Sequence, residues 1–544
     1  MRTILTIITF WLTVVSTNAA DRLASLPHPI LGGELSNSAA SSVADIDAVL
    51  PRMKALRLNT VLVPAYWELT EPEEGRMDFT LIDRTIDVAR REGLHIIFLW
   101  FGAWKNSMSC YAPEWFKRDT KRFPRAMNAM GKQLEIASCF SPEVLQADLQ
   151  AFSALMRRIR EKDPERQVVV MMQIENEIGM LESARDHAPL AEQAYRQERW
   201  AERYGTSEEA DEQFMALSYA RYVEHLARAA REIHDMPLYV NAAMNSRGRR
   251  PGEYPSAGPL AHLIDFWQKG APSIDLLAPD IYDTGFKGWC ERYAMPLRPQ
   301  DNGKVRNRLF IPESRCCENS GVRALYAFGE HQALGFSPFA IDQAGDEATT
   351  AVTKAYGIIG QMACVKAQNS WGLLFDETDR ERIISDEGVV MTCRHYFTLP
   401  WDQRATNKST WPEGGAMLIK LGHMDYLLAG SGVVVDFKTP TEKQQEEKNT
   451  LGEDGFAEGT GASSDSGAPS DSGRASNSVK ASGSAKGRFY GKRLGLLAVD
   501  EVEIFPNGGM SVVRRLNGDQ THQGRHARIS VGEWAILHIR LYEY

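Results

Sequence analysis

Val168-Val-Val-Met-Met-Gln-Ile-Glu-Asn-Glu177 and Leu309-Phe-Ile-Pro-Glu-Ser314 are short apolar runs that each end in carboxylate side chains. Runs of this length and composition are typical of buried parallel strands. Six similar runs lie at Pro29–Leu35, Thr60–Tyr66, His95–Gly102, Leu238–Ala243, Ile274–Tyr282 and Phe336–Asp342. Segments of helical periodicity separate them, including 43–56, 80–92, 144–162, 208–234, 320–333 and 348–366. Eight strands alternating with helices predict an α/β fold, a (β/α)8 TIM barrel rather than an open doubly wound sheet.

The barrel pattern covers residues 21–370, and a second pattern follows it. Helical periodicity fades after 370, and short apolar runs predict a smaller antiparallel β domain over 371–544. We favour a packing module over a sugar-binding module for this domain. Within it, residues 439–487 are rich in Ser, Gly, Glu, Asp and Lys and nearly free of large apolar side chains. Such a segment buries too little surface to offset the entropy of ordering, which predicts a disordered insertion.

The first twenty residues have the pattern of a secretory signal peptide. Arg2 precedes an apolar run from Ile4 to Val15, and the small residues Ala19 and Ala20 suit a cleavage site. The run is shorter than the roughly 20 apolar residues that span a bilayer, which disfavours a membrane anchor. We therefore expect a secreted or, in a bacterium, periplasmic protein with no membrane association after cleavage.

Composition restricts the partners. The 544 residues are 43% apolar and 24% charged, with a formal net charge of −9. This balance disfavours nucleic acid, which is bound through clustered Lys and Arg, and suits a neutral carbohydrate. The seven cysteines have no CxxC spacing, so a zinc cluster is not expected. A bridge between Cys110 and Cys139 stays open.

Two carboxyl groups are needed to hydrolyse a glycoside with retention of configuration, and they face each other at about 5–5.5 Å. Active residues of a TIM barrel lie at the carboxyl ends of its strands. An Asn-Glu pair closes the predicted fourth strand and a Glu closes the seventh, as in the large clan of retaining barrel glycosidases. Because two carboxyl groups suffice for this chemistry, no metal or organic cofactor is expected.

At these motifs the chain resembles glycoside hydrolase family 35, the β-galactosidases. The stretches that carry the resemblance are Gln173-Ile-Glu-Asn-Glu-Ile-Gly179, with Ile178 in place of an aromatic residue, Gly33-Glu-Leu35 and Trp67-Glu-Leu-Thr-Glu-Pro-Glu-Glu-Gly75. Three others are similar to a microbial branch with an extra C-terminal β domain. They are Tyr111-Ala-Pro-Glu-Trp115, Asp275-Leu-Leu-Ala-Pro-Asp-Ile-Tyr282 and Arg515-Leu-Asn-Gly-Asp-Gln-Thr-His-Gln-Gly524.

The resemblance implies that Glu177 is the acid/base, Glu313 the nucleophile and Asn176 a ligand of the sugar 2-hydroxyl. Strand alternation would instead place Glu175 beside Glu177 and turn Asn176 to the opposite face. Both Asn176 and Glu177 reach one sugar only if the strand end twists or bulges. We therefore take Glu175 as an inward-facing structural carboxylate, with an exchange of roles as the alternative.

Other residues at strand ends are weaker candidates for substrate binding. Tyr282 could hydrogen-bond the nucleophile, and we expect the indoles of Trp67 and Trp104 to contact sugar. Phe101-Gly-Ala-Trp104 stands where the family usually has Cys-Ala-Glu-Trp, so a carboxylate that contacts galactose is missing. Glu68 could take over that role. For Asp280 and Asn241 we favour a structural reading.

The sequence thus predicts a secreted retaining β-galactosidase of carbohydrate metabolism that cleaves terminal β-galactosyl residues, with plant polysaccharide side chains as one substrate. Two alternatives remain. The first is a retaining enzyme of other specificity, such as a β-glucosidase, β-xylosidase or transglycosylase. The second is a non-catalytic carbohydrate-binding protein, which the presence of both carboxylates disfavours.

Overall fold

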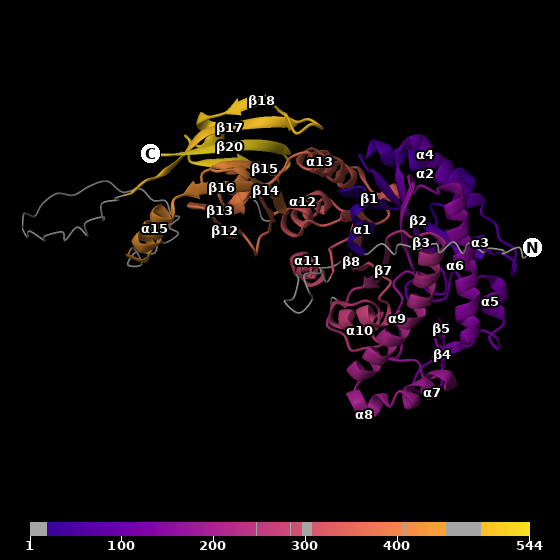
Figure 1. The fold of residues 1–544 in the computed structure, drawn as a ribbon. Coiled ribbons are helices and arrows are strands. Elements are labelled where there is room, and N and C mark those ends of the chain that lie inside the picture. The colour runs from indigo at the N-terminus through magenta and orange to yellow at the C-terminus, as the bar shows by residue number, and fades with distance from the viewer. Residues whose placement is uncertain (1–18, 246, 283, 296–306, 407–409, 453–490) are drawn as a thin grey trace, which may run out of the picture. The chain divides into compact units, whose positions relative to one another are not determined.

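The computed structural model describes residues 19–245, 247–282, 284–295, 307–406, 410–452 and 491–544. The chain folds into two compact units (Figure 1). The first extends to Val365 and includes Pro506–Gly508, and the second comprises Lys366–Phe505 and Gly509–Tyr544. The predicted signal peptide lies almost wholly outside the described residues.

The first unit is a closed barrel of eight parallel strands, which confirms the predicted fold class. Around the barrel the order is β1, β2, β3, β6, β7, β8, β9 and β10. The strands are β1 (Ile30–Glu34), β2 (Thr60–Tyr66), β3 (His95–Phe101), β6 (Val169–Gln173), β7 (Leu238–Ala243), β8 (Leu276–Ile281), β9 (Ile311–Ser314) and β10 (Gly335–Pro338). All eight lie within or overlap the apolar runs of the sequence. The strand residues are almost all buried, as expected of a parallel sheet covered by helices.

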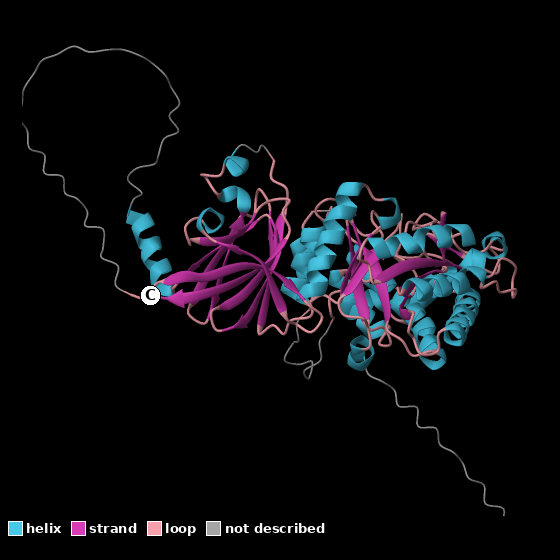
Figure 2. Cartoon of the chain, turned by 90° about the horizontal axis from the view of Figure 1, so that it is seen from above, coloured by secondary structure: helices cyan, strands magenta, loops and turns pink. Residues whose placement is uncertain are grey.

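Helices surround the barrel (Figure 2). A short hairpin follows β3 (Figure 1). The helices of this unit are α1 (Ala19–Ala24), α2 (Val43–Ala55), α3 (Trp67–Thr70), α4 (Thr80–Glu92), α5 (Glu114–Arg118), α6 (Pro142–Lys162), α7 (Pro189–Gln197), α8 (Trp200–Tyr204), α9 (Glu208–Ile233), α10 (Ile264–Gly270), α11 (Phe286–Tyr293), α12 (Ser320–His331) and α13 (Asp346–Met362), with 3-10 turns at Ala261–Leu263 and Ile341–Gln343. The hairpin is β4 (Arg125–Met127) and β5 (Gln133–Ala137).

Local sequence signals set several helix boundaries. Ser141 and Ser207 are the N-caps of α6 and α9, where each side chain accepts a hydrogen bond from a backbone N–H of the first turn. Gly93 ends α4 with a φ of 64°, a left-handed conformation that favours glycine. No helix among the described residues is long and apolar enough to cross a bilayer.

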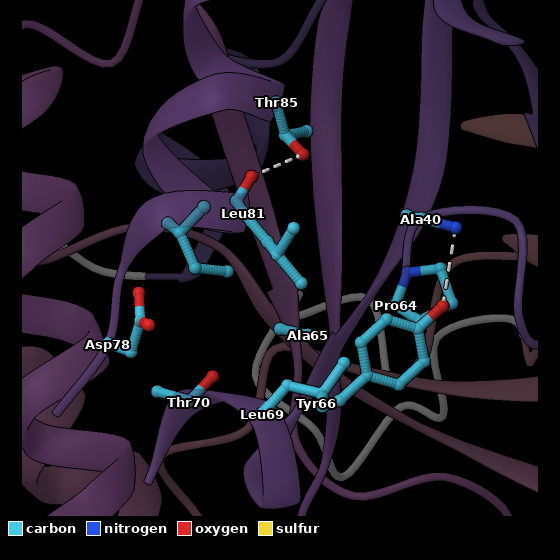
Figure 3. A pocket seen from close by; sticks show the side chains of 10 residues that line it. Ala40, Pro64, Ala65, Tyr66, Leu69, Thr70, Asp78, Leu81 and Thr85 are labelled. Atoms are coloured by element: carbon cyan, nitrogen blue, oxygen red, sulfur yellow. Dashed lines mark hydrogen bonds between the residues drawn. The ribbon is translucent and has the colours of Figure 1, made fainter. Parts of the chain in front are cut away.

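A small cavity lies between β2 and α4 (Figure 3). Tyr66 accepts a hydrogen bond from the Ala40 backbone N–H at 3.4 Å, and Thr85 donates one to the Leu81 carbonyl at 2.8 Å. The volume open to water is about 10 Å³, room for one water molecule. This cavity is therefore too small to hold a sugar.

Two antiparallel sheets form the second unit. A six-stranded sheet has the order β11-β14-β15-β20-β17-β18, and a four-stranded sheet has the order β12-β13-β16-β19. One apolar core draws residues from both sheets, so they pack face to face. The elements of the second unit are β11 (Asn369–Phe375), β12 (Glu381–Asp386), β13 (Val389–His395), α14 (Gln403–Thr406), β14 (Gly414–Gly422), β15 (Asp425–Ser431), β16 (Val433–Lys438), α15 (Pro440–Gly452), β17 (Leu494–Ile504), β18 (Met510–Leu516), β19 (His526–Ile529) and β20 (Ala535–Glu543), with 3-10 turns at Tyr396–Thr398 and Gly518–Thr521.

Helix α15 contradicts part of the insertion predicted to be disordered. Its N-terminus is fixed because Glu442 accepts hydrogen bonds from the backbone N–H groups of Thr439 and Leu494 and pairs with Arg493 at 2.7 Å. The prediction is therefore wrong for residues 439–452, where specific polar contacts replace an apolar face. Residues 453–487 of the predicted insertion lie outside the described residues.

Candidate active site

The chain leaves strand β6 in an unusual backbone conformation. Glu175 has a φ of 58° and Glu177 a φ of 46°, the left-handed region that costs a residue with a side chain roughly 1 kcal/mol or more. The Asn176 N–H donates to the Trp104 carbonyl at 3.2 Å, and the Glu177 N–H donates to Asn241 Oδ1 at 2.9 Å. These bonds hold the strained segment in place.

This conformation removes the objection from strand alternation. The strand ends at Gln173, so Asn176 and Glu177 are not bound to opposite faces of a regular strand. Both side chains enter the same site. Glu175 instead accepts a hydrogen bond from the Trp104 backbone N–H at 2.8 Å and interacts with buried Asp148. Its placement agrees with a structural role.

Glu313 closes β9 and accepts three hydrogen bonds. Asn176 and Asn241 donate their Nδ2–H groups to Oε1 at 3.0 and 3.1 Å, and the Tyr282 hydroxyl donates to Oε2 at 2.7 Å. Donors from three neighbouring strand ends thus fix this carboxylate. An oriented carboxylate of this kind is suited to nucleophilic attack.

The surroundings of Glu177 favour a protonated carboxyl group, whereas three donors hold Glu313 as a carboxylate. Its side chain is almost fully buried, and Asn106 donates its Nδ2–H to Oε2. Burial and the negative charge of Glu313 raise the pKa of Glu177 to about 7, against the opposing effect of Lys105. Glu177 therefore keeps a proton in mildly acidic solution, as a general acid requires.

The separation of the two carboxyl groups indicates the stereochemical outcome. Glu177, Asp280 and Glu313 each have a carboxylate oxygen within 4.8 Å of the others. Retaining glycosidases place their carboxyl groups about 5–5.5 Å apart, and inverting enzymes about 6.5–9.5 Å apart. The site therefore has the compact geometry of a double-displacement mechanism.

Asp280 and Asn241 belong to the site, contrary to the structural reading favoured from the sequence. Asp280 stands in register with Glu313 on the adjacent strand, and Asn241 donates to Asp280 Oδ2 at 2.7 Å. Burial, then the charges of Glu313, Glu177 and Glu34, raise the pKa of Asp280 well above its usual range. A strand alignment in the sequence that set Asp280 level with Glu313 would have identified it.

Lys105, Asn106 and Glu34 were not identified from the sequence. Lys105 and Asn106 directly follow the stretch that lacks the family carboxylate, and Lys105 Nζ lies 4.9 Å above the Phe101 ring. Glu34 ends β1, is fully buried, and has its pKa raised by burial and by Glu313. The motif Gly33-Glu-Leu35 was the available signal for Glu34; none marked Lys105.

Two predicted sugar contacts are wrong because the indoles lie in the core. The Trp67 ring is fully buried among Trp100, Trp115 and Phe116, and its Nε1–H donates to Glu71 at 2.9 Å. The Trp104 ring is equally buried.

Its edge-to-face neighbours are Tyr219 and Tyr222, at 5.5 and 4.8 Å between ring centroids. The backbone of Trp104 contacts the site, through Asn176 and Glu175.

Glu68 does not join the carboxylate cluster either. Its side chain is 37% exposed and pairs with Lys117 at 3.6 Å, on the helix that follows the loop after β3. Its backbone N–H donates to the Tyr111 carbonyl at 3.0 Å. The structure therefore gives no support to Glu68 as a replacement for the missing family carboxylate.

The carboxylate cluster could in principle hold a hard cation, since Glu177, Asp280 and Glu313 offer three oxygen ligands. However, N–H and O–H donors already occupy both oxygens of Glu313 and Oδ2 of Asp280. The donor set fits proton chemistry better than metal binding.

The bridge between Cys110 and Cys139 that the sequence left open is not formed. All seven cysteines are free thiols.

Comparisons with known proteins match the two units to different families. A glycoside hydrolase family 42 model, described as Beta-galactosidase, matches residues 40–224. A model described as Domain of unknown function (DUF5597) matches residues 352–528. The resemblance to family 35 is therefore wrong, although the expected enzyme class, a glycoside hydrolase of the β-galactosidase kind, agrees with the match. The Asn-Glu pair at the end of the fourth barrel strand and the Glu at the end of the seventh are common to the clan of retaining barrel glycosidases. They therefore do not separate its families.

Among curated proteins, the chain is similar to β-galactosidase from Thermus thermophilus, at 24% identity over 279 residues, which is 46% of this chain. It is also similar to β-galactosidase BgaA from a Thermus species, at 23% identity and the same coverage. The chain spans 40% of the length of these relatives.

Among solved structures, the chain is similar to a catalytic mutant of a family 42 β-galactosidase from G. stearothermophilus, with a TM-score of 0.46, 16% identity, and coverage of 61% of this chain and 57% of that one. A β-galactosidase from Bacillus circulans has a TM-score of 0.46, 15% identity, and coverage of 61% and 56%.

Proposed function

We propose that the chain is a retaining β-galactosidase that cleaves terminal β-galactosyl residues by double displacement. One observation carries the proposal. A protonated Glu177, whose pKa is about 7, and a Glu313 carboxylate oriented by three donors have oxygens within 4.8 Å of each other. The match of residues 40–224 to a β-galactosidase family supports the choice of galactose.

In the first step Glu313 attacks the anomeric carbon while Glu177 gives its proton to the glycosidic oxygen. The bond between the anomeric carbon and the glycosidic oxygen breaks, and the sugar becomes a glycosyl ester of Glu313. In the second step Glu177 takes a proton from water, whose oxygen attacks the anomeric carbon and releases Glu313. We infer that Asn176, whose Nδ2 lies 3.0 Å from Glu313 Oε1, binds the sugar 2-hydroxyl.

A panel of nitrophenyl β-glycosides tests this function. Galactose and glucose differ only in the orientation of the 4-hydroxyl, and a site built to bind one orientation leaves polar groups unpaired with the other. We expect hydrolysis of the β-galactoside to exceed that of the β-glucoside by about a hundredfold in kcat/KM. Similar rates on the two sugars would defeat the galactosidase proposal and leave retaining hydrolysis standing. No turnover of any member would favour a binding protein.

We also propose that the protein is exported and acts outside the cytoplasm, with side chains of plant polysaccharides as a substrate. The apolar run from Ile4 to Val15 supports export, and the net charge of −9 suits a neutral polymer. Fractionation of cells that express the full chain would test export. Release of galactose from plant galactan would test the substrate.

A further inference from the structure

Asp280 is a buried carboxyl group that the double-displacement mechanism leaves without a task. It lies near the end of β8, is 1% exposed, and pairs in register with Glu313 on β9. Its Oδ2 accepts the Asn241 Nδ2–H at 2.7 Å. This bond leaves Oδ1 as the oxygen that can carry a proton, because Oδ1 accepts no hydrogen bond from a donor among the described residues.

The Asp280 and Glu177 carboxyl groups have oxygens within 4.8 Å of each other, and they share a side-chain hydrogen bond that lowers the pKa of Glu177 and raises that of Asp280. Two carboxylates cannot do so without a proton between them, so at least one member of the pair is protonated. Asn241 contacts both members of the pair. Its Nδ2–H donates to Asp280 Oδ2, and its Oδ1 accepts a hydrogen bond from the Glu177 backbone N–H. The two carboxyl groups are thus held by one amide side chain.

The surroundings favour a proton on Asp280. Burial is the largest cause that raises its pKa, and the neighbouring negative charges add to it. The titratable groups that face Asp280 and its neighbours come from several strands of the barrel, the loops that follow them and helix α11, with one cation among them. They are Glu34, Lys105, Glu177, Tyr239, Tyr282, Tyr293 and Glu313.

We propose that Asp280 is a positioning residue for the general acid: its carboxyl O–H donates to Glu177 and stabilises the Glu177 carboxylate that forms when the proton leaves. This inference rests on the proposed glycosidase function. As the glycosidic bond breaks, the Glu177 proton passes to the departing oxygen, and Asp280 keeps its own proton throughout. In the second step the same hydrogen bond holds Glu177 as it accepts a proton from water. Asp280 therefore acts through Glu177 and does not contact the sugar.

The leaving-group dependence of kcat/KM tests this role. A good leaving group such as dinitrophenolate needs little protonation, whereas phenolate needs more. For Asp280→Ala we expect a loss of about ten- to a hundredfold on phenyl β-galactoside, the effect expected of a hydrogen bond to a charged group. On dinitrophenyl β-galactoside the expected loss is below about threefold. Asp280→Asn should recover most of the activity, because an amide N–H can donate to Glu177.

Asp163→Ala is the matched control. Asp163 is also buried, but it accepts the backbone N–H groups of Val168 and Val169 at the opposite end of β6. Its loss should lower the melting temperature and affect both substrates equally. Equal losses on both substrates in Asp280→Ala would overturn the positioning role.

A second measurement does not depend on the folding of Asp280→Ala. If Asp280 is neutral, Asp280→Asn replaces one neutral donor with another, and the basic limb of the pH profile stays in place. A shift of that limb to lower pH by about one unit would show that Asp280 carries a negative charge, and would overturn the proposal. A wild-type protein that hydrolyses neither galactoside would refute the proposed function itself, which separates the two failures.

Discussion

Glu177 decides the pH dependence of the proposed enzyme. Its pKa of about 7, raised by burial and by Glu313, means that the protonated acid is lost as the pH rises through neutrality. We expect the basic limb of kcat/KM to fall near pH 7. In Glu177→Ala this limb should vanish for dinitrophenyl β-galactoside, because that substrate does not need the acid. A limb that persists would assign the acid to another group, such as Glu175.

Glu313 is the nucleophile of the proposed mechanism. In Glu313→Gln an amide replaces the nucleophile and cannot form the glycosyl ester, so kcat should fall on the order of a thousandfold or more. The amide side chain has the same shape and still accepts hydrogen bonds, so the fold should persist. Steady-state kinetics and the circular dichroism spectrum together check this. Near wild-type turnover would remove Glu313 from the mechanism.

At the scale of single residues, the sequence pointed to Glu177 and Glu313 and to two neighbours of Glu313, Asn176 and Tyr282, which the structure brings together with it. Glu177 and Glu313 could be found because they close apolar strands in recognisable motifs. Asn241 and Lys105 could not be found in this way. Asn241 hydrogen-bonds Glu313 and Asp280, and the charge of Lys105 acts on Glu177, all of them residues distant in the chain. Trp67 was misassigned because an aromatic residue at a strand end can face the core as easily as the site.

At the scale of elements, the strands could be predicted well because each is a continuous apolar run. The end of β6 could not, since the left-handed conformations of Glu175 and Glu177 come from bonds to the loop after β3. Helix α15 could not be predicted either. Its sequence has no apolar face, and the contacts of Glu442 with Arg493 and Leu494 join residues about fifty positions apart.

Glu442 gives a prediction for this helix. Its partly buried carboxylate accepts the backbone N–H groups of Thr439 and Leu494, so Glu442→Ala leaves two donors without their partner and should cost about 1–3 kcal/mol. Deletion of residues 453–487 with a short Gly/Ser link should change the melting temperature little, because loop length contributes weakly. Calorimetry of the two variants checks both expectations. A deletion that destabilises more than Glu442→Ala would contradict them.

At the scale of the whole molecule, the buried carboxyl groups link stability to pH. Burial, and then neighbouring acidic groups, raise the pKa values of Glu34, Glu175 and Asp280 well above their usual range. The folded state therefore binds more protons than the unfolded state above about pH 4.5, so these groups stabilise less as the pH rises.

We expect this contribution to fall as the pH rises above about 5, through the raised pKa values of these groups. Glu34→Gln removes one titrating group and should make the decline of the melting temperature with pH shallower. Thermal unfolding at several pH values measures the slope. An unchanged slope would show that Glu34 is not protonated in the folded protein.

The identity of the covalent intermediate tests the central claim most directly. A 2-deoxy-2-fluoro-β-galactoside with a dinitrophenyl leaving group should form the glycosyl ester quickly and release it slowly, because the fluorine destabilises both transition states. Peptide mass spectrometry of the trapped protein then locates the sugar. The account predicts one fluorogalactosyl group on Glu313. A label on Glu177, Glu175 or Asp280, or no label on a protein that hydrolyses galactosides, would contradict it.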